Sequence, residues 1–111
     1  MNSRFGVRKA LVLSNGRTAG HLLANRRRFV FLYDDAYLAA GGPSIAIGLP
    51  KSRRVFSSNH LFPYFSGLLP EGENRKFVCR RLKLDPDDGF ALLLALAGHE
   101  TIGNVVVRPA P

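Results

Sequence analysis

Short apolar runs separated by turn residues fill much of the first third of the chain, a pattern typical of β-strands. An apolar run over residues 8–14 ends at Asn15 and Gly16, a pair that readily adopts the positive φ angles of a tight hairpin turn. We therefore expect strands over residues 8–14 and 17–24. Aromatic and β-branched residues predict a third strand over about residues 27–33. The three strands are expected to form an antiparallel meander.

The middle of the chain predicts a short helix, a buried strand and a basic loop. The acidic residues Asp34 and Asp35 precede residues 36–40, which favour helix. Residues 43–49 show strand periodicity with little polar surface, so we expect a buried strand there. Three cations make residues 51–54 a basic loop.

The rest of the chain predicts helices and a closing strand. Residues 57–59 offer N-cap side chains for the first helix, and Asp85 and Pro86 are typical of the start of the last one. The second helix is expected to bury one apolar face, formed by Phe77, Val78, Leu82 and Leu84. The expected helices cover residues 61–68, 71–84 and 90–97, and the strand covers residues 104–108.

This segregation of strands and helices predicts an α+β fold. We expect a small antiparallel or mixed β-sheet, in which the three-stranded N-terminal meander packs against a C-terminal cluster of helices. The chain has 111 residues and contains no linker or internal repeat, which indicates a single domain over residues 1–111.

Composition narrows the functional classes. Apolar residues make up 46% of the chain and charged residues 22%, as in an ordinary globular protein. The longest apolar run, residues 90–97, is much shorter than the roughly 20 residues of a membrane-spanning helix. The start of the chain does not resemble an export signal, so we expect a cytoplasmic protein. Cys79 is the single cysteine, and we expect it to be buried in a helix.

Candidate catalytic and metal-binding residues are scattered. The sequence contains neither a phosphate-binding glycine loop nor a kinase motif. His99 and Glu100 could form an acid/base pair, but a solvated turn after a helix is the favoured interpretation. Asp87 and Asp88 are interpreted as acidic residues at a helix start. The possible metal ligands fall on separate predicted elements: His21, His60, Cys79 and His99. We therefore expect no cofactor, no metal and no enzymatic activity.

The charge distribution suggests a nucleic-acid partner as an alternative. Sixteen Lys and Arg against eight Asp and Glu give a formal net charge of +8. Three arginines stand together at residues 26–28, and Lys76, Arg80 and Lys83 would share one helix face. Such a face could follow phosphates, although a solvated helix face has the same pattern.

Residues 61–72 are crowded with large apolar and aromatic side chains and end in a Pro-Glu-Gly turn. One interpretation is a core helix with its exit turn. The other is a docking patch, because a small domain can hardly bury all of these groups.

Motifs over nearly the whole chain match one known family in order. They include Asn15-Gly16, Ala19-Gly20, the strand-like residues 43–50, Leu61-Phe62-Pro63-Tyr64-Phe65, Leu68-Leu69-Pro70-Glu71-Gly72, Arg75, Phe90-Ala91-Leu92-Leu93, Gly98 and Ile102-Gly103-Asn104-Val105. By these residues the chain resembles the N-terminal subdomain of the HipA family of serine/threonine kinase toxins.

In that family the subdomain precedes a kinase core, whereas this sequence stops at Pro111. The resemblance therefore implies a free-standing subdomain. It is similar to the HipS antitoxins of bacterial HipBST toxin–antitoxin systems, which bind and inhibit the kinase HipT beside its active site. The resemblance implies a HipT-like kinase partner. It also implies a ternary complex with a HipB-like helix-turn-helix DNA-binding protein, an indirect association with DNA, and no membrane.

The residues that the resemblance places against the kinase form one apolar turn tipped by carboxylates: Phe65, Leu68, Leu69, Pro70, Glu71, Gly72, Glu73 and Asn74. Glu73 stands where some free-standing relatives carry an aromatic side chain able to plug the kinase pocket. The sequence also departs from the family pattern at Ala46, Gly48 and residues 99–101. A basic nucleic-acid-binding module and a truncated kinase subdomain that supports folding are the alternative interpretations.

Overall fold

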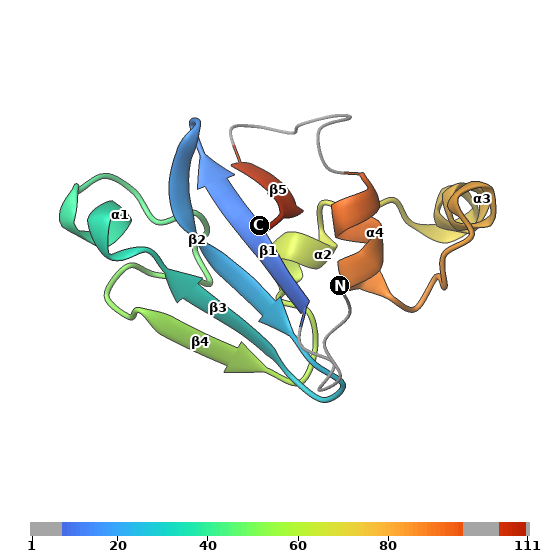
Figure 1. Cartoon of the computed structure of the whole chain (residues 1–111), viewed down its shortest axis with the longest axis horizontal. Coiled ribbons are helices and arrows are strands. Elements are labelled where there is room, and N and C mark those ends of the chain that lie inside the picture. The colour runs from blue at the N-terminus through green and yellow to red at the C-terminus, as the bar shows by residue number, and fades with distance from the viewer. Residues whose placement is uncertain (1–7, 97–104, 111) are drawn as a thin grey trace.

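The computed structural model describes residues 8–96 and 105–110. This part of the chain forms five strands and four helices (Figure 1). Their bounds are β1 Arg8–Ser14, β2 Arg17–Ala24, β3 Phe29–Tyr33, α1 Asp35–Ala39, β4 Val55–Ser58, α2 Pro63–Ser66, α3 Gly72–Leu82, α4 Gly89–Ala95 and β5 Val105–Pro109. The interpretations made above for Gly98, His99, Glu100, Thr101 and residues 102–104 fall outside the described residues.

All strands belong to one sheet with the order β4-β3-β2-β1-β5, and every neighbouring pair is antiparallel. The predicted meander and the α+β class are confirmed, and the sheet is antiparallel rather than mixed. Asn15 and Gly16 have φ angles of 51° and 78°, as the predicted hairpin turn requires. The last strand returns to pair with the first.

The strand predicted over residues 43–49 is wrong, because this segment forms an irregular loop. Its backbone polar groups bind a side chain instead of a neighbouring strand. The buried hydroxyl of Tyr33 donates to the carbonyl oxygen of Leu49 and accepts from the backbone N–H of Ile45 at 3.1 Å. Burial raises the pKa of this hydroxyl, so it remains a donor at neutral pH.

The edge position beside β3 belongs to β4, where Phe31 pairs with Phe56. Sequence reasoning missed this strand because it holds four residues and exposes three of its side chains in part or in full. Ser57 and Ser58, predicted as N-cap residues of the next helix, lie in this strand instead. The N-cap of α2 is Phe62, which makes no side-chain capping bond.

The other predicted helices are confirmed with small shifts in their ends. Asp34 caps α1 by accepting a hydrogen bond from the N–H of Ala36 at 3.1 Å. α2 is a single turn that begins at Pro63, where the missing N–H of proline costs nothing. α3 and α4 occupy the positions expected for the second and third helices. The predicted start of the last helix at Asp85 and Pro86 is wrong, because α4 begins at Gly89 and its N-cap is Asp88.

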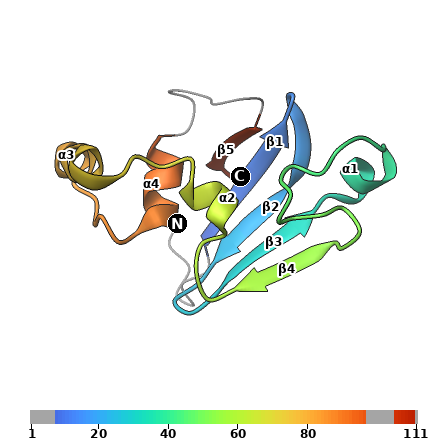
Figure 2. The ribbon, with the colours of Figure 1, turned by 180° about the vertical axis from the view of Figure 1, so that it is seen from behind.

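The hydrophobic core lies on one face of the sheet. Figure 2, from behind, shows α2 and the loop after α1 lying over that face, with α4 beside the edge formed by β1 and β5. Its largest fully buried side chains include Phe31 and Tyr33 from the sheet and Phe65 and Phe90 from the helices. The ring centroids of Phe31 and Phe65 lie 5.9 Å apart. α3 stands at the far end of the molecule, away from the sheet (Figures 1 and 2).

Candidate partner-binding surface

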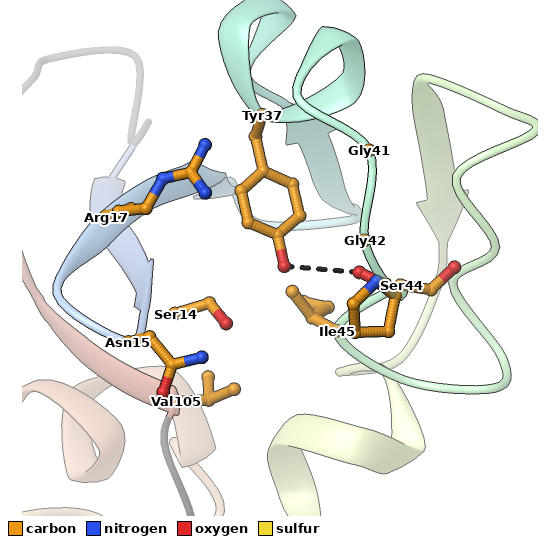
Figure 3. A pocket seen from close by; sticks show the side chains of 10 residues that line it. Ser14, Asn15, Arg17, Tyr37, Gly41, Gly42, Ser44, Ile45 and Val105 are labelled. Carbon is orange, nitrogen blue, oxygen red and sulfur yellow. Dashed lines mark hydrogen bonds between the residues drawn. The ribbon is translucent and has the colours of Figure 1, made fainter.

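One hollow on the described surface carries no catalytic group. It is a cleft of about 250 Å³ between the β1–β2 hairpin and the loop after α1 (Figure 3). Its polar side chains include Ser14, Asn15 and Arg17, and the hydroxyl of Tyr37 donates to the carbonyl of Pro43 at 3.3 Å. Among the described lining residues there is no carboxylate, imidazole or thiol that could activate a hydroxyl as a nucleophile.

The other candidate reactive groups do not assemble either. Across residues 8–96 and 105–110, no three His, Cys, Asp or Glu side chains lie close enough together to hold a metal ion. Cys79 is 1% exposed, which confirms the prediction of a buried helical cysteine. No helix of the described chain is long and apolar enough to cross a membrane.

Two of the eight predicted contact residues are core residues. Phe65 is fully buried and Leu69 is 5% exposed, so neither side chain is available to a partner. Phe65 lies edge-on to the ring of Tyr64, with centroids 5.3 Å apart, and also contacts the rings of Phe31 and Phe62. Leu68 is partly buried and packs against the same cluster. These residues hold the segment to the sheet, as the core-helix interpretation predicts.

The exposed part of the predicted site is the turn that leads into α3. Pro70 is half-buried, and the next four residues, Glu71, Gly72, Glu73 and Asn74, are exposed. Gly72 has a φ of 58°, a left-handed conformation that favours glycine. We call residues 70–74 the acidic turn. Its geometry is anchored from behind by Leu69 and from the helix side by α3.

The outward side of α3 continues this surface. Phe77 was predicted on the buried face of the helix, but it is 51% exposed. Cys79 is the buried residue of this described helix, and Leu82 is also largely exposed. On a helical wheel Phe77 lies one turn after Glu73, on the same side. The exposed Phe77 was missed because its neighbour Val78 carries an equally apolar side chain and the pattern alone did not decide which of the two points inward.

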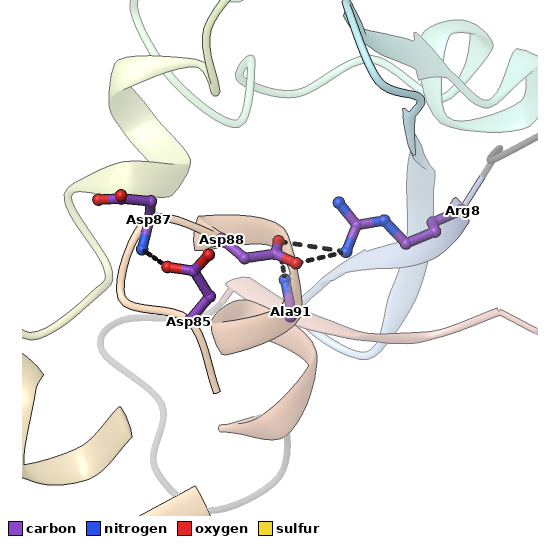
Figure 4. A network of polar contacts seen from close by, with 5 residues as sticks. All are labelled: Arg8, Asp85, Asp87, Asp88 and Ala91. Atoms are coloured by element: carbon purple, nitrogen blue, oxygen red, sulfur yellow. Dashed lines mark hydrogen bonds and ion pairs between the residues drawn. The ribbon is translucent and has the colours of Figure 1, made fainter. Parts of the chain in front are cut away.

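A polar network joins the start of α4 to β1. The Asp88 carboxylate caps α4 by accepting from the Ala91 N–H at 3.0 Å and pairs with the Arg8 guanidinium at 3.0 Å (Figure 4). Burial alone would raise the pKa of Asp88, but the Ala91 N–H and Arg8 outweigh it and lower the pKa. The helix-start interpretation of Asp88 is therefore confirmed.

The same network connects α3 to α4. The side chain of Arg75 donates from Nε to the carbonyl oxygen of Pro86 at 2.8 Å. Asp85 accepts a hydrogen bond from the N–H of Asp87 at 2.8 Å and so tightens the turn between the two helices (Figure 4). These bonds orient α3 even though it projects away from the sheet.

The basic residues are spread over separate parts of the molecule. One group lies at the turn between β2 and β3, a second precedes β4, and a third lies on α3 (Figure 1). Some cations have local partners, since Arg54 pairs with Asp35 at 3.2 Å and Lys76 with Glu73 at 3.4 Å. Within the part of the chain that the structure describes, these groups do not form the single stripe that follows a phosphate backbone.

Comparisons with known proteins agree on one relationship. The family model described as HipA N-terminal domain matches residues 10–108. An uncharacterized protein of Haemophilus influenzae is 31% identical over 102 residues, which cover 92% of each chain. A putative kinase of Sinorhizobium fredii, Y4mE, is 34% identical over 94 residues, and the match spans 83% of this chain but 22% of the kinase.

A solved structure titled N-terminal domain of HipA toxin superimposes with a TM-score of 0.74. It is 29% identical, and the match covers 98% of both chains. The agreement in fold thus extends over the sheet and the helices alike.

Proposed function

The chain belongs to the HipA N-terminal domain family, and from that premise we propose that it is a HipS-like, non-catalytic antitoxin. It binds a HipT-like serine/threonine kinase near the active site and holds it inactive. The relative from Haemophilus influenzae, which has nearly the same length, supports a role for this domain as a separate protein. The match to a small part of a putative kinase supports a kinase as the partner.

One observation carries the proposal. The acidic turn is exposed, while Phe65 and Leu69 directly before it are buried in the core. A rigid base and an accessible tip are what a docking element needs, because little conformational entropy is lost on binding. The carboxylates of Glu71 and Glu73 at the tip suit a nucleotide pocket lined by basic and glycine-rich elements.

A HipB-like helix-turn-helix protein completes the proposed assembly. In this arrangement the chain reaches DNA through the HipB-like protein rather than through its own arginines. The separate placement of its basic groups supports an indirect association.

The test is co-expression with a HipT-like kinase from the same genome, with purification in high salt and an autophosphorylation assay. An apolar interface persists in high salt, whereas phosphate contacts weaken steeply. We expect a stable complex with suppressed autophosphorylation. Failure to associate, together with salt-sensitive DNA binding, would overturn the proposal in favour of a nucleic-acid module.

The role of the acidic turn is tested by the double variant Glu71→Ala and Glu73→Ala. Asp87→Ala is the matched control, because Asp87 is an exposed carboxylate outside the turn. We expect the double variant to lose kinase inhibition and the control to retain it. Unchanged inhibition by the double variant would remove the turn from the mechanism.

A further inference from the structure

The face of the sheet opposite the core is apolar although the helices leave it open. Figure 1 looks onto this face, and the covering α2 lies behind the strands. Its middle row crosses four strands through the paired residues Leu11, His21, Leu32 and Val55. Directly opposed residues of antiparallel strands project from the same side, so these four side chains form one continuous row.

A second row runs parallel to the first, through Lys9, Leu23, Val30 and Ser57. On the β5 side, Val106 pairs with Leu13 and extends the apolar area. We call this area the outer sheet face, defined by Leu11, Leu23, Val30, Leu32, Val55 and Val106. None of these six described side chains belongs to the core cluster or to the apolar residues packed against it.

An antiparallel sheet with one solvated face normally alternates apolar and polar residues. Here both alternate positions are apolar, as in the sequence Val30, Phe31, Leu32, which is typical of a strand covered on both faces. Val55 is 46% exposed, so it is available at the edge of the face. With strands about 4.8 Å apart and about 3.3 Å per residue, the face measures roughly 300 Å². That area suits the centre of an interface of about 800 Å² per partner.

The charges around the outer sheet face indicate what covers it. Arg108 pairs with Leu11 across β1 and β5, and Lys9 ends the second row. At the opposite end of that row, on β4, Arg28 donates to the hydroxyl of Ser57 at 2.8 Å. None of the five described strands carries an Asp or Glu. A second copy would bring the same cations together, at a net charge of +8 on each chain, and would be repelled.

We propose that the outer sheet face docks onto a second protein through an apolar surface bordered by carboxylates, and that this protein is the kinase of the proposed function. The inference therefore rests on the proposed function. It adds a second contact, separate from the acidic turn. The outer sheet face supplies affinity, while the acidic turn supplies inhibition.

The test compares two exposed aliphatic positions, Val55 at 46% exposure on the sheet and the fully exposed Ile47. Val55→Glu places a carboxylate on the outer sheet face at its edge, where the sheet tolerates it best. Ile47→Glu is the matched control, because Ile47 is fully exposed on the loop before β4. We expect Val55→Glu to weaken binding to the HipT-like kinase at least about tenfold and Ile47→Glu to change the dissociation constant less than about twofold.

A charge variant keeps the test informative if Val55→Glu fails to fold. Lys9→Glu combined with Arg108→Glu changes only the border of the face, and we expect it to slow association with the kinase and to reduce its salt dependence. Thermal unfolding by circular dichroism establishes that each variant is folded. At saturating concentration, Val55→Glu is still expected to inhibit the kinase.

Two results would overturn the inference while the proposed function stands. One is wild-type affinity for the kinase in both folded face variants. The other is self-association of the wild-type chain in sedimentation experiments that Val55→Glu abolishes, which would assign the face to a second copy. If the wild-type chain does not bind the kinase at all, the proposed function itself fails, so the two failures are distinguishable.

Discussion

Replacing Phe65 by alanine separates a core role from a contact role within the predicted site. Phe65 is fully buried and contacts three other aromatic rings. Truncating a buried phenylalanine to alanine costs about 3–5 kcal/mol of unfolding free energy. A domain of this length has a stability of about 5–15 kcal/mol. Phe65→Ala therefore removes a large part of the free energy of unfolding, and the protein can still fold.

Binding should respond quite differently from stability. A remaining stability of about 2 kcal/mol still gives a folded-to-unfolded ratio of about 30. The apparent dissociation constant rises only by the inverse of the folded fraction, which is a change of less than about a tenth. Urea unfolding measures the first quantity, and titration against the HipT-like kinase measures the second.

Phe77→Ala is the matched control, because Phe77 is the same residue type but is half exposed. The contact that Phe77→Ala removes is the stacking of the ring against the Arg81 guanidinium, 5.7 Å from the ring centroid. We therefore expect a loss of about 1 kcal/mol of unfolding free energy. The core assignment is refuted if Phe65→Ala and Phe77→Ala lose similar stability. It is also refuted if Phe65→Ala weakens kinase binding well beyond its unfolded fraction.

Three further substitutions test the architecture by urea unfolding. Gly20→Ala is expected to destabilise the sheet by several kcal/mol, because the added Cβ would overlap the carbonyl oxygen of Leu32; a loss below about 0.5 kcal/mol would contradict that close approach. Tyr33→Phe removes the hydroxyl that holds the loop before β4, and we expect a loss of about 1–3 kcal/mol with the sheet intact by circular dichroism. Asp88→Asn keeps the helix cap but loses the ion pair with Arg8, so we expect a loss below about 1 kcal/mol at pH 7. Because folding lowers the pKa of Asp88, its charged form stabilises the native state at pH values above its unfolded-state pKa of about 4. The stability difference between wild type and Asp88→Asn should therefore fade as the pH drops below about 4. A difference that stays constant down to pH 2 would contradict this.

Local chemistry made the first three strands and α1 predictable. The Asn15-Gly16 pair determines the hairpin, and Asp34 determines the start of α1, because both act through residues next to them in sequence. The last strand and the segregation into strands and helices were predicted for the same reason.

The errors occur where distant residues decide the structure. Residues 43–49 have strand periodicity, but the Tyr33 hydroxyl takes the polar groups that a neighbouring strand would need. β4 takes the position beside β3 with four residues, too few for a periodic signal.

Packing also determines which residues of the predicted contact site are accessible. Composition showed that residues 61–74 combine apolar groups with a polar turn, but only packing shows that Phe65 and Leu69 are buried and that residues 71–74 are exposed. The outer sheet face had a signal in the sequence, the consecutive apolar residues Val30, Phe31 and Leu32. This run of apolar residues indicates an exposed apolar face only when the helices are known to cover the other side of the sheet.

Kinase inhibition is tested most directly by the autophosphorylation rate of a HipT-like kinase from the same genome, titrated with this chain in high salt. We expect the rate to fall toward zero and to saturate near one chain per kinase. A kinase rate that stays unchanged at a saturating concentration of folded chain would contradict it.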